Sequence, residues 1–347
     1  EGWPTLYNNY VIFKTSFTHL VQGLDLYQTY PESYYDLYKY SPAFAVLMAP
    51  FSILPDILGL TLWNLVNTLV LIAGVRSLKG LSSHNQNFLL LFLLPELVIS
   101  LQNAQSNALV CGLMLLALGM LEKQKPITAS LMLALGTAIK IFPLAGFLLL
   151  LLFPNLVRTM AWSAFWLMVM FLIPLPFTGL DGFSDVYTSW INLLENDHSQ
   201  STGLSIFAWL NAWFPGLPDK NALLIIGLIL LIISFIPALI NRKYAAKPIH
   251  YLAILLIWIV IFNHKAESPT FILAMCGIGL WCFGQQITVP SLLIVVASIV
   301  LVSLSPTDLF PGTWKEGWVK TGVWKAFPCV LVWALISFHL LSIPFRK

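Results

Sequence analysis

The stretch YLAILLIWIVIFNHKAESPTFILAMCGIGLWCFG, residues 251–284, contains two apolar runs on either side of a short polar turn. Neither run contains an Asp, Glu, Lys or Arg, and each is long enough for several helical turns. The turn, NHKAESP at 263–269, instead carries three ionisable residues, His264, Lys265 and Glu267. This pattern predicts a buried helical hairpin of a membrane protein. It also raises the question of why the connection is charged.

The composition of the whole chain supports a membrane protein. Of its 347 residues 58% are hydrophobic and only 10% are charged, and the mean hydropathy is +0.82. Such values exclude an ordinary soluble domain and predict an all-α, polytopic integral membrane protein. A spanning helix needs about 20 apolar residues. The candidate spans are 57–75, 86–101, 106–121, 126–139, 141–153, 160–177, 222–241, 249–263, 269–284, 288–304 and 325–343.

The distribution of charge predicts which ends of these spans face the cytoplasm. Short loops on one side hold ten of the eighteen basic residues, and basic short loops are typically cytoplasmic. The long segments on the other side hold thirteen of the fifteen acidic residues. This assignment requires that SPAFAVLMAPFSILP, 41–55, does not cross the bilayer, and its three prolines favour a juxtamembrane or re-entrant piece. The turn NHKAESP therefore faces outward.

One domain over 1–347 is the predicted organisation. It comprises an outer loop with a juxtamembrane helix (1–56), a first transmembrane module (57–177), an outer loop with an amphipathic helix (178–221) and a second transmembrane module (222–347). The chain begins at Glu1 without a methionine, so a first spanning helix is expected upstream. The run 126–153 is either a bent hairpin or one long kinked element.

Lys140 lies in the apolar stretch GTAIKIFP and is the first candidate for a binding residue. A lysine at mid-bilayer costs about 2.5–3.5 kcal/mol on insertion scales, so it needs water or a partner. One interpretation is a lysine that snorkels to the interface. The other is a cation directed at an anionic group in the outer half of the bundle.

Further polar side chains are predicted to lie on the same outer side. In SLQNAQSNALV, 100–110, the amides either cap helices or donate to a sugar. Glu96, inside a span, is predicted to face the bundle and not the lipid. The outer candidates are Asp36 and Lys39 in the aromatic N-terminal segment, Gln102, Gln105 and Asn107 in the amide-rich turn, and His198 in ENDHSQSTG.

Several classes of chemistry find no support in the sequence. There is no phosphate-binding glycine loop, dinucleotide fingerprint or HExxH motif. The four cysteines lie in apolar runs without metal-ligand spacing. We therefore expect no cofactor, no nucleic-acid partner and no metal-ligand set in this sequence, and the requirement for a metal stays open. An outer catalytic centre has no nucleotide sugar available, so its activated substrate would arrive as a lipid-linked donor.

Five stretches resemble glycosyltransferase family 87 of the GT-C superfamily: DLY (25–27), LYKYSPAFAVLMAPFSILP (37–55), SLQNAQSNAL (100–109), LGTAIKIFP (135–143) and QSTGLS (200–205). The resemblance implies a GT-C-like bundle of about 11–12 transmembrane helices with re-entrant or juxtamembrane helices on the outer face. It also implies an extracytoplasmic active site, a polyprenyl-phosphate sugar as donor, and a catalytic aspartate in the first outer loop.

One departure from the family pattern concerns that aspartate. Where the family has an acidic residue, this chain has Asn9, and an amide cannot act as a general base. Either Asp36 or another outer carboxylate takes the role, or activity is lost. The residues expected to hold the lipid phosphate are Lys140, Lys39, His264 and Lys265. Those expected to hold the sugar or acceptor are Gln102, Gln105, Asn107, His198 and Glu267.

The resemblance thus implies transfer of a hexose, with mannose among the candidates, to a lipid-linked or cell-envelope glycan. The protein is expected to be a multi-pass protein of the cell membrane, in bacteria the inner membrane. A charged outer turn would then serve to meet an anionic lipid phosphate, although a local ion pair at the water boundary would give the same pattern. The alternatives are a polar-lipid transporter or flippase, which the lack of paired helix interruptions disfavours, and a non-catalytic glycolipid-binding relative, which Asn9 favours.

Overall fold

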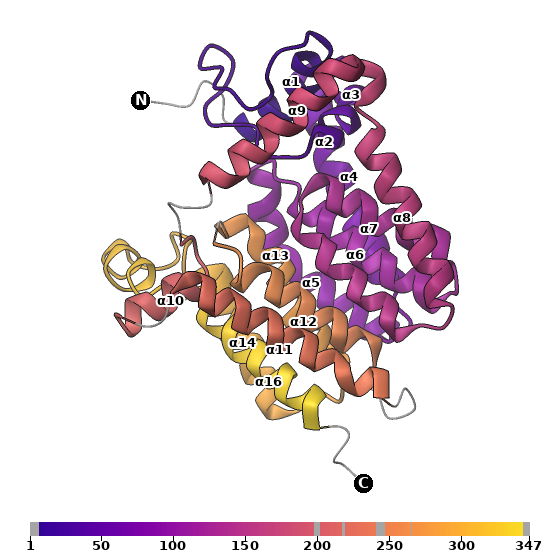
Figure 1. Ribbon diagram of the computed structural model, residues 1–347. Coiled ribbons are helices and arrows are strands. Elements are labelled where there is room, and N and C mark those ends of the chain that lie inside the picture. Colours follow the sequence, from indigo (N-terminus) through magenta and orange to yellow (C-terminus); the bar gives the residue numbers. More distant parts are fainter. Residues whose placement is uncertain (1–6, 198–201, 217–218, 241–246, 265, 343–347) are drawn as a thin grey trace.

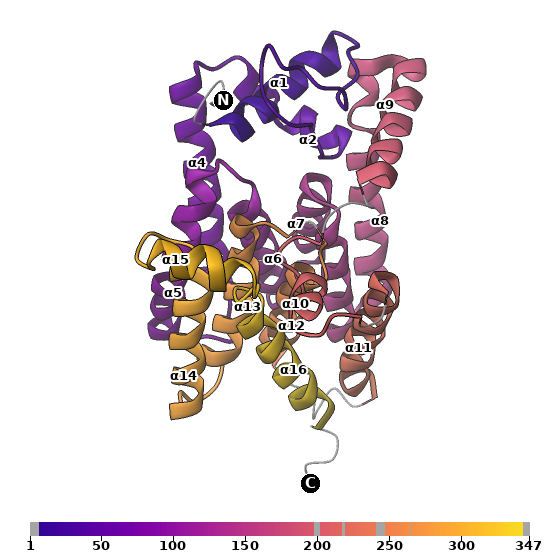
Figure 2. The same ribbon diagram turned by 90° about the vertical axis from the view of Figure 1, so that its left-hand side faces the viewer.

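The computed structural model describes residues 7–197, 202–216, 219–240, 247–264 and 266–342. Within these ranges the regular structure is entirely helical, with no strand (Figures 1 and 2). The predicted all-α class is therefore confirmed.

The main bundle consists of apolar helices joined mostly by short connections, so that successive helices run antiparallel. They coincide within a few residues with the predicted apolar spans. Their bounds are α4 (Asp56–Ser77), α5 (Ser83–Gln102), α6 (Asn107–Glu122), α7 (Pro126–Ile139), η1 (Phe142–Leu152), α8 (Leu156–Leu172), α11 (Lys220–Ile240), α12 (Pro248–Ile261), α13 (Phe271–Phe283), α14 (Val289–Ser298) with η4 (Ile299–Leu304), and α16 (Phe327–Ser342).

The helices of the bundle differ in whether they are long enough to cross a bilayer. Among the described residues, α4 and α11 are long and apolar enough to cross a bilayer alone. Helix α8 and the following α9 (Leu175–Asp197) would give a third span if this pair, bent by 83°, is one broken span. The remaining apolar helices of the bundle are mostly shorter, between 10 and 17 residues.

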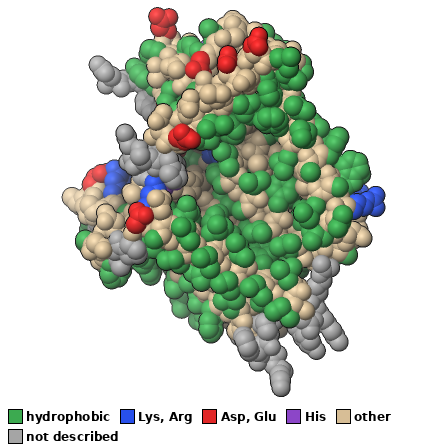
Figure 3. All heavy atoms as spheres, in the orientation of Figure 1, with side chains coloured by type: hydrophobic (Ala, Val, Ile, Leu, Met, Phe, Trp, Pro, Cys, Tyr) green, Lys and Arg blue, Asp and Glu red, His purple; other side chains and the backbone are tan. Residues whose placement is uncertain are grey.

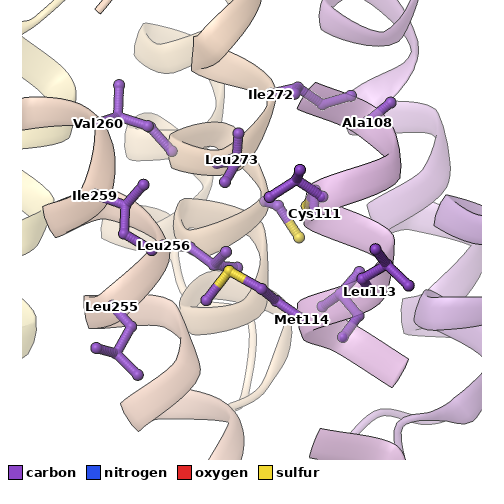
Figure 4. Close-up of a cluster of buried hydrophobic side chains, with 14 of the residues drawn as sticks. Ala108, Cys111, Leu113, Met114, Leu255, Leu256, Ile259, Val260, Ile272 and Leu273 are labelled. Atoms are coloured by element: carbon purple, nitrogen blue, oxygen red, sulfur yellow. The ribbon is translucent and has the colours of Figure 1, made fainter. Parts of the chain in front are cut away.

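Helices α6, α12 and α13 form the centre of the core (Figure 4). Cys111 and Met114 of α6 lie opposite Leu256 of α12 and Ile272 of α13, and all four side chains are buried. Tight packing between helices, rather than release of water, holds such an apolar bundle together in lipid. The packing at Gly112 of α6 is especially tight, because a Cβ at this position would lie 2.6 Å from the backbone of α4.

A layer of further helices covers one end of the bundle, which we call the outer end (Figure 2). It consists of residues 7–55, with α1 (Asn8–Val21), α2 (Pro42–Leu47) and α3 (Ala49–Ser52), together with α9. Helices α2 and α3 are too short to cross a bilayer, in agreement with the prediction that 41–55 does not cross. Acidic side chains gather over this end (Figure 3).

Most of the segment 178–197, predicted as part of an outer loop, is helix α9, and its place outside the bilayer stays a prediction. The segment alternates polar and apolar side chains and has no continuous apolar run, so it resembles a loop when judged by hydropathy. Helix α9 packs against α1 within the outer layer, where the rings of Phe17 in α1 and Phe177 in α9 lie 5.3 Å apart. The amphipathic helix expected within 203–216 is present as α10 (Ile206–Trp213).

The run 126–153 is a bent hairpin and not one kinked helix. Lys140 has an extended backbone, with φ −141° and ψ 142°, which separates α7 from η1. Gly136 faces Pro143 and Gly146 faces Leu133, so the two arms pack antiparallel. The turn of this hairpin, with Lys140, therefore lies at the outer end.

Candidate functional site

Lys140 lies half-buried at the turn of the α7–η1 hairpin. Its Nζ donates a hydrogen bond of 2.7 Å to Oδ1 of Asn107, the first residue of α6. The ammonium also lies 5.5 Å from the ring centroid of Tyr40 and 5.7 Å from that of Phe142. Among the described residues, no carboxylate forms an ion pair with Lys140. The direct contacts to this cation are neutral, and Glu267, whose charge also acts on it, forms no ion pair with it among the described residues.

The outer layer is attached to the bundle beside this lysine. The Tyr40 hydroxyl donates to Oε1 of Gln105 at 3.1 Å, and the Ser41 hydroxyl donates to the carbonyl of Ala138. Burial raises the pKa of the Tyr40 hydroxyl, and the charges of Glu267 and Asp36 act in the same direction. Tyr40 therefore stays protonated near neutral pH and can keep donating.

Asp36 and Asn9 occupy different parts of the outer layer. Asp36 has a left-handed backbone (φ 76°), a conformation that Asp tolerates better than most residues. Its side chain is about half exposed (51%), accepts a hydrogen bond from the N–H of Leu37 and forms an ion pair of 2.9 Å with Lys39. Asn9 donates at 2.9 Å to the carbonyl of Asn103, so it ties α1 to the amide-rich turn.

The turn NHKAESP packs against the segment that leads into α10. Gly203 has φ +50°, and a Cβ at this position would lie 2.8 Å from the carbonyls of His264 and Ala266. The N–H of Leu204 donates to the carbonyl of Ala266 at 2.8 Å. Glycine is therefore required here, and two stretches from distant parts of the sequence meet at the outer end.

Several predicted site residues come together and others do not. The charge of Glu267 acts on both Lys140 and Tyr40, so this exposed carboxylate belongs to the same region. Gln102 is exposed and His264 half-buried. His198 and Lys265 lie outside the described residues. The residues that the structure brings together are Tyr40, Gln105, Asn107, Lys140 and Glu267.

The surface is hollowed between the outer layer and the part that carries α10, and a basic side chain is visible inside the hollow (Figure 3). A second cavity, of about 690 Å³, lies at the opposite end of the bundle. Asn85 and Lys247 line it, but both donate to the last carbonyls of α13, at Phe283 and Gly284. We therefore assign the second cavity no chemistry. In the described ranges, no group of three or more His, Cys, Asp or Glu could hold a metal ion.

A buried ion pair behind the site was missed by the sequence analysis. Lys325 is 3% exposed, and its Nζ lies 3.3 Å and 3.5 Å from the carboxylate oxygens of Glu96 and 2.8 Å from Oγ of Ser268. Glu96 is fully buried, which confirms that it faces the bundle. The only sequence signal for Lys325 was a lysine at the start of the apolar run 325–343, and nothing in that run identifies its partner.

Fold and hydropathy together define a helical membrane protein whose polar candidate residues gather at one end. The model of glycosyltransferase family 87 matches residues 38–262, well over half of the chain. The chain therefore belongs to glycosyltransferase family 87, and it is a membrane glycosyltransferase. A comparison with curated proteins found no match. The matched range includes Gln105, Asn107 and Lys140 but not Asn9, Asp36 or Glu267.

Proposed function

We propose that this glycosyltransferase transfers a hexose, such as mannose, from a polyprenyl-phosphate-linked donor to a lipid-linked or cell-envelope glycan. The reaction takes place on the extracytoplasmic face of a multi-pass protein, in bacteria in the inner membrane. The observation that supports this most strongly is Lys140, a cation held by an amide and two rings instead of a carboxylate. Such a cation has its charge available for an anionic ligand.

In the proposed reaction Lys140 binds the donor phosphate, with help from Lys39, His264 and Lys265. The bond between the anomeric carbon and the phosphate oxygen breaks, and negative charge builds up on the departing lipid phosphate. A preorganised cation in a partly desolvated place stabilises that charge more strongly than water does. Asn107 holds the ammonium in position without cancelling its charge.

Asp36 is the proposed general base. Its carboxylate is half exposed, so an acceptor hydroxyl can reach it, and its charge acts on Tyr40 beside the hairpin turn. As the acceptor oxygen bonds to the anomeric carbon, Asp36 takes its proton. Asn9 cannot do this and serves instead to hold α1 against the turn at Asn103.

The amide-rich turn is the proposed sugar-binding element. Gln105 accepts from Tyr40 and Asn107 accepts from Lys140, in both cases through the amide oxygen. Gln105 and Asn107 are 8% and 1% exposed, and their amide nitrogens are the proposed donors to sugar hydroxyls. Gln102, His198 and Glu267 are the further proposed contacts to sugar or acceptor.

The donor requirement tests this proposal. The purified protein, reconstituted in liposomes, is given a glycolipid acceptor and either a polyprenyl-phosphate hexose or the corresponding nucleotide hexose. Transfer is expected only from the lipid donor. Efficient transfer from the nucleotide sugar would overturn the proposed donor, and binding of the lipid donor without transfer would favour a non-catalytic glycolipid-binding relative.

Sidedness is tested separately in intact cells. Cysteines introduced at Asp36 and Glu267 should react with an impermeant thiol reagent added outside, whereas a cysteine at Lys123 should not. The native cysteines in the described chain are all buried, so the background should be low. Labelling of both groups from the same side would contradict the proposed topology.

A further inference from the structure

The buried Lys325 connects three elements that are far apart in the sequence. Glu96 comes from the middle of α5, Ser268 from the turn before α13, and Lys325 itself from the segment just before α16. The ammonium also lies 4.9 Å from the ring centroid of Phe271, the first residue of α13. Glu96 accepts through both carboxylate oxygens, and the hydrogen bond to Ser268 is the shortest of the three.

Ser268 directly follows Glu267 and begins η3 (Ser268–Thr270). The described residues just before η3, Ala266 and Glu267, belong to no helix, so neighbouring groups must fix their position. One such contact is the backbone hydrogen bond from Leu204 to Ala266. Lys325 supplies a second contact from the bundle side, through its hydrogen bond to Ser268. Ser268 is the neighbour in sequence of Glu267, whose charge acts on Lys140.

The ion pair is not needed to make this core stable. Taking two charges out of water costs about as much as their attraction returns, and apolar side chains of similar volume are often as stable or more so. The pair does supply a donor with a defined direction, because Glu96 holds the ammonium while it donates to Ser268. With 3% exposure, Lys325 is shielded from any substrate, so an effect on transfer must act through other residues.

We propose that Lys325 is a positioning residue for sugar transfer, which acts through its hydrogen bond to Ser268 to hold the adjacent Glu267 in place. Glu96 fixes the Lys325 ammonium for this task. The inference rests on the proposed function in one respect, the assignment of the Lys140 region to donor and sugar. The hydrogen bond and its effect on the turn are independent of that assignment.

Ser268→Ala tests the proposal without leaving a buried charge unpaired, because the contact between Lys325 and Glu96 is kept. Loss of one hydrogen bond to a charged group is expected to lower kcat per folded molecule about tenfold. Ser268→Thr keeps the hydroxyl and should stay within about threefold of the wild type. The matched control is Ser337→Ala, a buried serine of α16 that donates to the carbonyl of Trp333 in its own helix. It should leave kcat unchanged.

A second readout does not depend on activity. In a Glu267→Cys variant, the rate of labelling by an impermeant thiol reagent reports how firmly the turn is held. Adding Ser268→Ala should raise this rate severalfold, and adding Ser337→Ala should not. An unchanged labelling rate, or an increased rate with unchanged kcat for Ser268→Ala, would overturn the positioning role. If the wild type transfers no hexose from the lipid donor, the proposed function fails, whereas the labelling comparison still decides whether the hydrogen bond holds the turn.

Discussion

Lys140 and Lys325 both lie in apolar surroundings, but they differ in whether a carboxylate pairs with the ammonium. Lys325 is almost fully buried and paired with Glu96, which also cannot reach solvent. Lys140 is half-buried, and its described partners are the amide of Asn107 and the rings of Tyr40 and Phe142. The charge of Lys325 is therefore neutralised by Glu96, whereas no ion pair among the described residues neutralises that of Lys140. This difference is consistent with the two proposals, that Lys325 positions the turn at Ser268 and that Lys140 binds an anionic ligand.

The largest expected effect comes from breaking the buried pair. Glu96→Leu leaves Lys325 charged and unpaired, and removing one partner of a buried pair costs about 3–5 kcal/mol. Thermal unfolding in detergent should show a large loss of stability. The double variant Glu96→Leu/Lys325→Met should recover most of it, because no uncompensated charge remains. A single variant as stable as the double variant would show that the pair is not desolvated.

Removing the charge of Lys140 should affect transfer much more than stability. Lys140→Met keeps most of the apolar stem and breaks no ion pair among the described residues. A hydrogen bond to a charged partner is worth about 1.5–3 kcal/mol, so kcat/KM for the lipid donor should fall about tenfold to a hundredfold. Lys140→Ala should behave in the same way, and Lys140→Arg should keep part of the activity because the charge remains. Normal transfer by the Met and Ala variants would make Lys140 a snorkelling lysine.

A smaller effect is expected when Lys140 is given a carboxylate partner, as Lys325 has. Asn107→Asp places a carboxylate 2.7 Å from the ammonium in nearly the same shape. The new ion pair competes with the donor phosphate, so KM for the donor should rise by about tenfold, while thermal stability should be kept or increased. Asn107→Gln is the neutral control, and its effect should be smaller. An unchanged KM for the donor in Asn107→Asp would show that Asn107 and Lys140 take no part in donor binding.

Apolar periodicity was sufficient to predict most of the bundle. Runs such as 57–75 and 269–284 became α4 and α13 within a few residues, because an apolar run of this length in lipid must satisfy its backbone as a helix. The helices of the outer end were harder to predict. Both α1 and α9 carry polar side chains on one face, so hydropathy alone could not separate them from loops.

The site was predictable as a set of residues but not as a geometry. Lys140, Gln105 and Asn107 were singled out as polar groups interrupting apolar sequence, and the structure brings them together. Tyr40 was not chosen, because a tyrosine in an aromatic segment has no distinguishing signal. The partnership of Lys325 with Glu96 joins positions 229 residues apart, and only the folded arrangement of α5 and the segment before α16 shows it.

Binding of a polyprenyl phosphate without its sugar tests the role of Lys140 most directly. Affinity would be measured by titration of the reconstituted protein, comparing Lys140→Met with Lys14→Met. Lys14 is a matched control, since it lies in the outer layer but is already paired with Asp56 at 2.5 Å. Loss of the available charge should weaken binding at least about tenfold in Lys140→Met, and Lys14→Met should bind like the wild type. Equal affinities for the two variants would contradict the assignment of Lys140 to the lipid phosphate.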